Sequence, residues 1–178
     1  YASFEYPLNE DILPLIDQLK NNDIPSISPT NLYNYTFLKT CEDKCEKLTS
    51  LRLVIIIKSA MNNFERRQAI RNTFGYERRF SDVTIRTVFL LGVKKSDNEN
   101  KLQKSIDMES KNYGDIIQAD FIDSYFNNTI KTMMGFNWIV KYCPNSSFYL
   151  FSDDDMYVSV KNLLRFVRNP SHYPEYIE

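Results

Sequence analysis

The chain has 178 residues, of which 43% are hydrophobic and 14% aromatic, enough apolar material for one domain with a substantial core. Its 22 basic and 23 acidic residues give a formal net charge of -1, so no general electrostatic attraction to nucleic acid is expected. The composition therefore excludes a disordered chain, and function has to come from a local site.

The first fifty residues predict an irregular leading segment. They contain four of the seven prolines, and all four glycines lie after them. One short amphipathic helix is predicted over residues 11–20, with Pro14 suited to its first turn. We therefore expect a stem-like segment over residues 1–50 and a folded domain over residues 51–178.

From residue 51 onward, predicted strands and helices alternate. The β-branched run at residues 51–57 is typical of a strand that is buried on both faces. A helix is predicted next at 64–73, with Gly75 as its cap, and then a strand at 83–91. The following helix begins at Ser96 or Asp97, runs to about 112 and is closed by Gly114. The remaining predicted elements are a strand at 115–118, a helix at 128–142, a strand at 148–151 and a helix at 160–168. This alternation predicts an α/β fold with βαβ units and a mainly parallel sheet.

Three acidic residues follow the strand predicted at 148–151, and they are Asp153, Asp154 and Asp155. Ligands of parallel sheets bind beyond the carboxyl ends of the strands, which is where this triplet would lie. Adjacent carboxylates repel one another, and with a nucleotide diphosphate they would hold Mg²⁺ or Mn²⁺. The alternative is a solvated acidic turn that leads into the next helix.

A second polar group follows the strand predicted at 51–57. Lys58 and Ser59 come directly after it, and Arg67 and Arg71 lie four residues apart in the next helix. Residues at this spacing share one helix face, so two guanidinium groups could clamp a phosphate or the edge of a nucleotide. The alternative is an exposed helix whose arginines pair with Glu65. Lys131 in the helix at 128–142 is open to either interpretation.

Cysteines and glycosylation sequons give a weaker indication of compartment. The three cysteines allow three single disulfides, each of which leaves one thiol over, and the sequence does not determine the pairing among Cys41, Cys45 and Cys143. N-glycosylation sequons, which are compatible with a lumenal protein, begin at Asn34, Asn127 and Asn145.

Six segments of the chain, taken in order, are Arg67–Gly75, Phe89–Gly92, Tyr113–Tyr125, Asn127–Thr132, Trp138 with Cys143, and Asp153–Val158. Together they resemble the β-1,3-galactosyltransferase family, which includes β-1,3-N-acetylglucosaminyltransferases. The resemblance covers about residues 50–168. It implies a GT-A-type, Rossmann-like nucleotide-sugar fold, of which this chain would be the donor-binding part, with a membrane anchor upstream.

The resemblance implies an inverting, Mn²⁺-dependent (or Mg²⁺-dependent) enzyme of the Golgi membrane, acting on its lumenal side. It would transfer galactose or an N-acetylhexosamine from UDP-galactose or UDP-N-acetylglucosamine to a hydroxyl of a glycan acceptor, forming a β-1,3 linkage. The acidic triplet would be the DxD-type motif, with Asp155 and Asp153 on the metal. The residues implied in nucleotide-sugar binding are Lys58, Ser59, Arg67, Arg71, Asp153 and Asp154.

The resemblance places the catalytic base outside this chain, so we expect the chain alone to bind donor without useful turnover. One alternative is therefore a nucleotide-sugar-binding fragment or pseudoenzyme. Another is an acidic Ca²⁺-binding or interaction domain, which leaves the segment Arg67–Gly75 unexplained.

Overall fold

The computed structural model describes residues 11–28, 32–46, 48, 50–94 and 101–168. The chain forms two compact units, residues 1–34 and residues 35–178. In the first unit, α1 (Leu13–Lys20) carries Pro14 in its first turn, as the sequence predicts. No residue of α1 is buried, so this helix contributes nothing to a core within its own unit.

The second unit is built on a five-stranded sheet with the order β1-β4-β3-β2-β5. In that order the strands are β1 (Phe37–Lys39), β4 (Ile116–Ile122), β3 (Thr84–Val93), β2 (Leu51–Lys58) and β5 (Ser146–Asp153). Strand β1 is antiparallel to β4, and the other neighbouring strands are parallel. The prediction of an α/β fold with a mainly parallel sheet is therefore confirmed.

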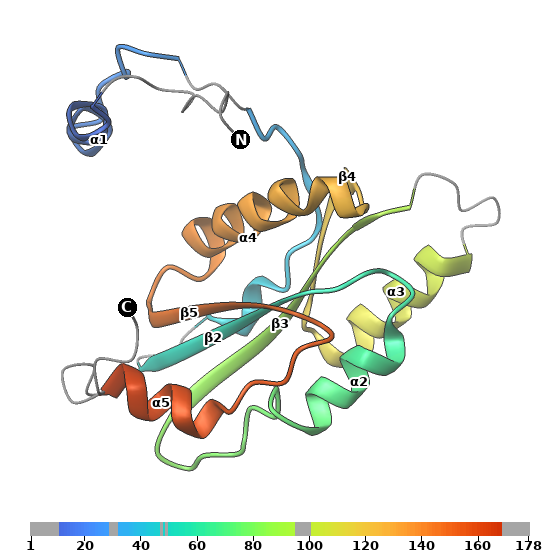
Figure 1. The fold of residues 1–178 in the computed structure, drawn as a ribbon. Helices are drawn as coiled ribbons and strands as arrows, with labels where there is room; N and C mark the ends of the chain where they lie inside the picture. Colours follow the sequence, from blue (N-terminus) through green and yellow to red (C-terminus); the bar gives the residue numbers. More distant parts are fainter. Residues whose placement is uncertain (1–10, 29–31, 47, 49, 95–100, 169–178) are drawn as a thin grey trace, which may run out of the picture. The chain divides into compact units, whose positions relative to one another are not determined.

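Helices cover both faces of this sheet (Figure 1). On one face lie α2 (Phe64–Asn72), α3 (Lys101–Tyr113) and α5 (Val160–Arg168), and on the other lies α4 (Asn128–Tyr142). Two short 3₁₀ helices complete the described elements, η1 (Glu42–Lys44) and η2 (Tyr125–Asn127). The predicted bounds of α2, α4 and α5, and the predicted end of α3, lie within a few residues of those observed.

The apolar run of β2 is explained by these two layers. Ile55 and Ile57 belong to the same core cluster as Phe74, which follows α2. Ile56 belongs instead to the cluster of Trp138 on α4, where Val54 also packs. Because alternate side chains of a strand point to opposite faces, a strand covered on both sides needs no polar positions.

The domain begins earlier than the sequence suggests. Residues 35–50 were assigned to the leading segment, but the second unit starts at Tyr35, and β1 adds to the sheet through the pairing of Phe37 with Ala119. A strand of three residues is too short to show an alternating pattern, and so β1 was not predicted.

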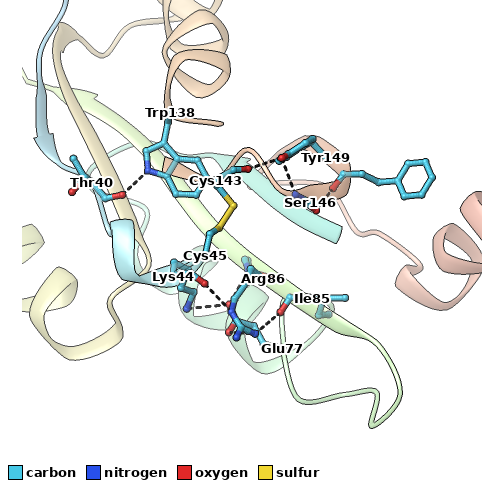
Figure 2. The surroundings of a disulfide bond; sticks show 12 residues. Thr40, Lys44, Cys45, Glu77, Ile85, Arg86, Trp138, Cys143, Ser146 and Tyr149 are labelled. Carbon is cyan, nitrogen blue, oxygen red and sulfur yellow. Dashed lines mark hydrogen bonds and ion pairs between the residues drawn. A yellow bond between two sulfur atoms is a disulfide. The ribbon is translucent and has the colours of Figure 1, made fainter. Parts of the chain in front are cut away.

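A disulfide between Cys45 and Cys143 fastens this early segment to the end of α4 (Figure 2). Beside it, the indole N–H of Trp138 donates a hydrogen bond to the carbonyl of Thr40, and the hydroxyl of Tyr149 donates to the carbonyl of Cys143. Cys41 is the remaining thiol, and burial raises its pKa above the usual range. The pairing that the sequence left open is thus settled.

Glycines end two of the helices for different reasons. Gly114 has φ of 60° after α3, a conformation that favours glycine, as expected of the residue that closes this helix. The N–H of Gly75 donates to the carbonyl of Ile70 at 2.9 Å, so it does help to cap α2. Its Cβ would lie 2.8 Å from Ile70 Cγ2, so crowding rather than a left-handed backbone requires glycine there. The predicted start of α3 at Ser96 or Asp97 lies outside the described residues.

Candidate functional site

The order in which strands are added to the sheet reverses at β2. Strands β3 and β4 follow on one side of it, and β5 pairs with its other side. In the parallel register of β2 and β5, Lys58 lies opposite Asp153, so the loops after both strands leave the sheet at one edge. Crevices at such switch points are the usual ligand sites of open α/β sheets.

The three aspartates after β5 do not point the same way. The side chains of Asp153 and Asp155 are 54% and 63% exposed, whereas that of Asp154 is 7% exposed. Asp153 Oδ1 lies 3.1 Å from the ammonium of Lys58. Asp155 Oδ2 lies 3.9 Å from Arg66 Nη1. The triplet therefore presents two accessible carboxylates and directs the middle one into the protein.

Asp154 is anchored by three donors from the loop after β2 and from α2. Its carboxylate accepts hydrogen bonds from Ser59 Oγ at 2.7 Å, Asn63 Nδ2 at 2.8 Å and Arg66 Nη1 at 2.9 Å. Burial alone would raise the pKa of Asp154, but the hydrogen bonds from these donors outweigh it and lower the pKa. Contact between Asp154 and a nucleotide stays a prediction, and its carboxylate already has three partners within the chain.

Ser59 is 2% exposed and is held from several sides. Its N–H donates to the carbonyl of Leu90 at 3.1 Å. Its carbonyl accepts a hydrogen bond from Lys131 Nζ at 2.8 Å, and the same ammonium lies 2.7 Å from Asp123 Oδ1. Lys131 therefore connects α4 to the end of β2, which gives a structural role to a residue that was open to two interpretations.

Arg67 and Arg71 do share one face of α2, as predicted, but that face packs against α3. Arg67 is 0% exposed, and its Nε and Nη2 donate to both oxygens of Glu109 at 2.9 and 2.7 Å. Arg71 donates to Glu109 at 2.7 Å and to both oxygens of Asp115 at 2.7 and 2.8 Å. A contact of these arginines with a nucleotide stays a prediction, and each already donates several hydrogen bonds inside the protein.

The charges of this buried cluster stabilise one another. Burial alone would raise the pKa of Glu109, but hydrogen bonds from Arg67 and Arg71 outweigh it and lower the pKa. Burial alone would lower the pKa of Arg71, but the hydrogen bonds that it donates to Asp115 and Glu109 outweigh this and raise the pKa. The alternative pairing of these arginines with Glu65 is not observed, because both point away from the exposed side of α2.

The two accessible carboxylates fit a divalent cation only if water or a bound phosphate supplies its remaining ligands. Within the described ranges, no three His, Cys, Asp or Glu side chains come together as a metal site. Asp153 and Asp155 alone supply hard oxygen ligands, which suits a Mg²⁺-like or Mn²⁺-like ion that keeps water or phosphate ligands. A closed, all-protein metal centre is therefore not what these described residues form.

Several residues at this site were not found from the sequence. Asn63 and Arg66 adjoin the predicted basic group, so their place beside the triplet could have been suspected. Glu109 gave no such signal, because its partner Arg67 is 42 residues away. Its burial on the inner face of α3 was the one property that helical periodicity could have indicated.

Comparisons with known proteins show which proteins this chain is similar to. A family model described as Galactosyltransferase matches residues 65–177. The chain is 42% identical to beta-1,3-galactosyltransferase brn of Drosophila melanogaster over 97% of its own length and 49% of that protein. It is 40% identical to human beta-1,3-galactosyltransferase 1 over 82% of its own length and 44% of that protein.

A relative of different printed specificity is also similar. The chain is 35% identical to human lactosylceramide 1,3-N-acetyl-beta-D-glucosaminyltransferase over 83% of its own length and 40% of that protein. The chain thus spans about half or less of the length of the curated relatives it matches. Among the described helices, none has the length and apolar character required to span a membrane.

Proposed function

The chain belongs to the galactosyltransferase family, and from this premise we propose that it forms the donor-binding part of a β-1,3-glycosyltransferase. The proposed reaction moves galactose or an N-acetylhexosamine from UDP-galactose or UDP-N-acetylglucosamine to a hydroxyl of a glycan acceptor, with inversion at the anomeric carbon. The printed names of the relatives include both sugars, which is why the proposal keeps both.

One observation carries the proposal. Two accessible carboxylates, Asp153 and Asp155, lie at the carboxyl end of β5, and Lys58 lies opposite them at the end of β2. A diphosphate is anionic and would be repelled by the carboxylates alone, but a divalent cation between them reverses this repulsion. The ammonium of Lys58 adds a hydrogen-bond donor from the end of the neighbouring strand.

The residues of the chain have separable tasks in this proposal. Asp153 and Asp155 would hold Mn²⁺ or Mg²⁺, which when bound would offset the negative charge that develops on the departing UDP. Lys58, partly released from Asp153, would donate to a phosphate oxygen. Asp154 keeps the loop in place. The base that accepts the acceptor proton is not assigned, and its location outside this chain stays a prediction.

The proposal is tested by measuring donor use directly. The 178-residue chain is incubated with UDP-galactose, UDP-N-acetylglucosamine or UDP-glucose, with Mn²⁺ or with a chelator. UDP binding is followed by calorimetry, and UDP release is followed with and without a panel of β-linked sugar acceptors. We expect metal-dependent binding of UDP and of one of the first two donors.

The outcomes separate the proposal from its rivals. Metal-dependent binding without UDP release agrees with a catalytic base outside this chain, and the same assay on a longer chain then separates the donor-binding part of an enzyme from a pseudoenzyme. Binding of Ca²⁺ with no nucleotide binding under any condition would reject the proposed function in favour of a cation-binding domain.

We also propose that the protein works in the Golgi lumen as a type II membrane protein, with its anchor upstream of this chain. The disulfide between Cys45 and Cys143 supports an oxidising compartment. Asn34 and Asn145 are exposed and could accept glycans, whereas the side-chain amide of Asn127 donates to the carbonyl of Ile122. Expression in secretory cells, followed by glycosidase digestion, tests this: a protein that stays unglycosylated and reduced would contradict it.

A further inference from the structure

Glu109 belongs to α3, which carries none of the proposed ligand-binding side chains, yet a continuous set of hydrogen bonds connects it to the acidic triplet. Its carboxylate accepts from Arg67 Nε at 2.9 Å and Nη2 at 2.7 Å. Arg67 Nη1 donates to Ser59 Oγ at 3.1 Å, and Ser59 Oγ donates to Asp154 Oδ2 at 2.7 Å. These four side chains form a hydrogen-bonded relay from Glu109 through Arg67 and Ser59 to Asp154. The relay joins α3 and α2 to the residues that directly follow β2 and β5.

The direction of each hydrogen bond in this relay is fixed by chemistry. A guanidinium has donors and no acceptor, so Ser59 Oγ must accept from Arg67. The single hydroxyl proton of Ser59 is then free to point at the carboxylate of Asp154, which as an anion only accepts. Arg67 is held in place by Glu109, which accepts from two of its nitrogen atoms, and by the carbonyls of Ala60 and Met61 at 2.6 and 3.1 Å.

The relay fixes more than Asp154. Asp153 is the last residue of β5, and Asp154 and Asp155 form the turn that follows, so holding Asp154 inward leaves the side chains of Asp153 and Asp155 exposed at the surface. The N–H of Asp154 also donates to the carbonyl of Lys58 at 3.2 Å, which fixes the backbone of the triplet against the end of β2. Loss of the relay would let this segment rotate and would separate the two accessible carboxylates.

We infer that Glu109 is a positioning residue for the acidic triplet: through Arg67 and Ser59 it sets the orientation of Asp153 and Asp155, and thereby the affinity for a metal-bound nucleoside diphosphate. The ligand part of this inference rests on the proposed function. Glu109 itself touches neither metal nor nucleotide.

The chain contains a matched control for Glu109. Asp115 is buried to the same degree, with 7% of its side chain exposed against 6% for Glu109, and both carboxylates hold Arg71. Asp115 accepts hydrogen bonds from Arg71 and not from Arg67, so Asp115→Asn breaks a buried ion pair and leaves the relay intact. Any effect that Glu109→Gln shows beyond that of Asp115→Asn therefore comes from the relay.

The experiment compares Glu109→Gln, Asp115→Asn and Ser59→Ala with the wild-type chain. Melting temperature, the Kd for UDP with Mn²⁺, and hydrogen exchange of the amides of residues 153–155 are measured for each. Both carboxylate variants should melt lower. Only Glu109→Gln and Ser59→Ala should raise the Kd, by about tenfold or more, as is usual for partners that orient a metal ligand. The same two variants should speed amide exchange in the triplet.

Each outcome decides the inference. Equal Kd and equal exchange in Glu109→Gln and Asp115→Asn would overturn it. If Glu109→Gln does not fold, Ser59→Ala breaks the relay at its next link and spares the buried ion pairs, and triplet amides that exchange no faster in Ser59→Ala than in Asp115→Asn would overturn the inference. If the wild-type chain binds no UDP with Mn²⁺, the proposed function fails, and amide exchange without ligand still decides whether Glu109 positions the triplet.

Discussion

Two clusters of charged residues are connected through Ser59, and they differ in how far their charges are exposed to solvent. In the cluster of Arg67, Arg71, Glu109 and Asp115, called the closed cluster below, each charge has a partner inside the chain and no side chain is more than 10% exposed. In the acidic triplet, Asp153 and Asp155 keep more than half of their side-chain surface exposed, and these two residues are called the open pair or open site below.

The difference teaches that residue type and position after a strand do not by themselves make a ligand site. Both clusters contain the arginines and carboxylates that phosphate and metal chemistry requires. The charged groups of the closed cluster are already paired with one another, so the cluster contributes to the stability of the fold and to the positioning of the triplet. The open pair retains free oxygen atoms and can bind a cation. Substitutions in the closed cluster should therefore mainly lower the free energy of unfolding, whereas substitutions in the open pair should mainly weaken the binding of UDP with Mn²⁺.

The largest expected effect is that of Arg67→Met on stability. The substitution leaves Glu109 buried with only one of its two cationic partners, and breaking a buried pair typically costs about 3–5 kcal/mol. The free energy of unfolding should fall by about this amount in urea denaturation. Arg78→Met on the exposed loop after α2 is the control and should change the free energy of unfolding little. Arg67→Met with near wild-type stability would show that the cluster is not closed.

The second prediction concerns the disulfide. Replacing both Cys45 and Cys143 by Ser should lower the free energy of unfolding by about 2–4 kcal/mol, because the bond closes a loop of 98 residues in the unfolded chain. Cys41→Ser, which removes the thiol that has no disulfide partner, is the control. The affinity for UDP with Mn²⁺ should not change, since the bond lies near the amino end of β5 and the triplet at its carboxyl end. A large loss of affinity would mean that the open site depends on the whole domain.

The third prediction tests the open site. Asp155→Asn should weaken binding of UDP in the presence of Mn²⁺ at least about tenfold, equivalent to about 1.4 kcal/mol, while the unfolding free energy stays close to wild type. Asp82→Asn, an equally exposed acid in the loop before β3, is the control and should bind as the wild type does. Calorimetry with and without a chelator measures both. Equal affinity for UDP after chelation of the metal would contradict the assignment of Asp155.

The sequence was sufficient for most of the fold. The bounds of α4 and α5 agree with prediction because caps, prolines and apolar spacing are local signals. Strand β1 was missed, because three residues carry no period and the strand forms only against β4. The disulfide could not be assigned, because any two of the three cysteines could pair until the fold brought the ends of η1 and α4 together.

The site was predicted less completely than the fold. The acidic triplet was found because an abrupt change from apolar to acidic residues marks the end of a buried strand. The directions of its side chains, and the burial of Arg67, were not available from spacing alone. Four-residue spacing correctly placed Arg67 and Arg71 on one face of α2, but nothing local says which element that face contacts. The deciding partner, Glu109, is brought there by the packing of α3.

The smallest expected effect is a pH dependence that comes from the closed cluster. The pKa of Glu109 lies below its ordinary value of 4.5, because hydrogen bonds from Arg67 and Arg71 outweigh the effect of burial. In acid, the unfolded chain therefore takes up a proton at Glu109 before the folded chain does. The stability that Glu109 contributes is complete above about pH 4.5 and is lost as the pH falls through the folded-state pKa.

Glu109→Gln tests this sign, because glutamine does not titrate. The difference in unfolding free energy between wild type and Glu109→Gln should be larger at about pH 6 than at about pH 3, as measured by urea denaturation at each pH. Arg78→Met, which changes no group that titrates in this range, should show the same pH dependence as the wild type. A difference that is constant from about pH 6 to about pH 3 would mean that Glu109 titrates alike in the folded and unfolded chains. Glu109 would then not be stabilised by its buried pairing, which is the property that separates the closed cluster from the open pair.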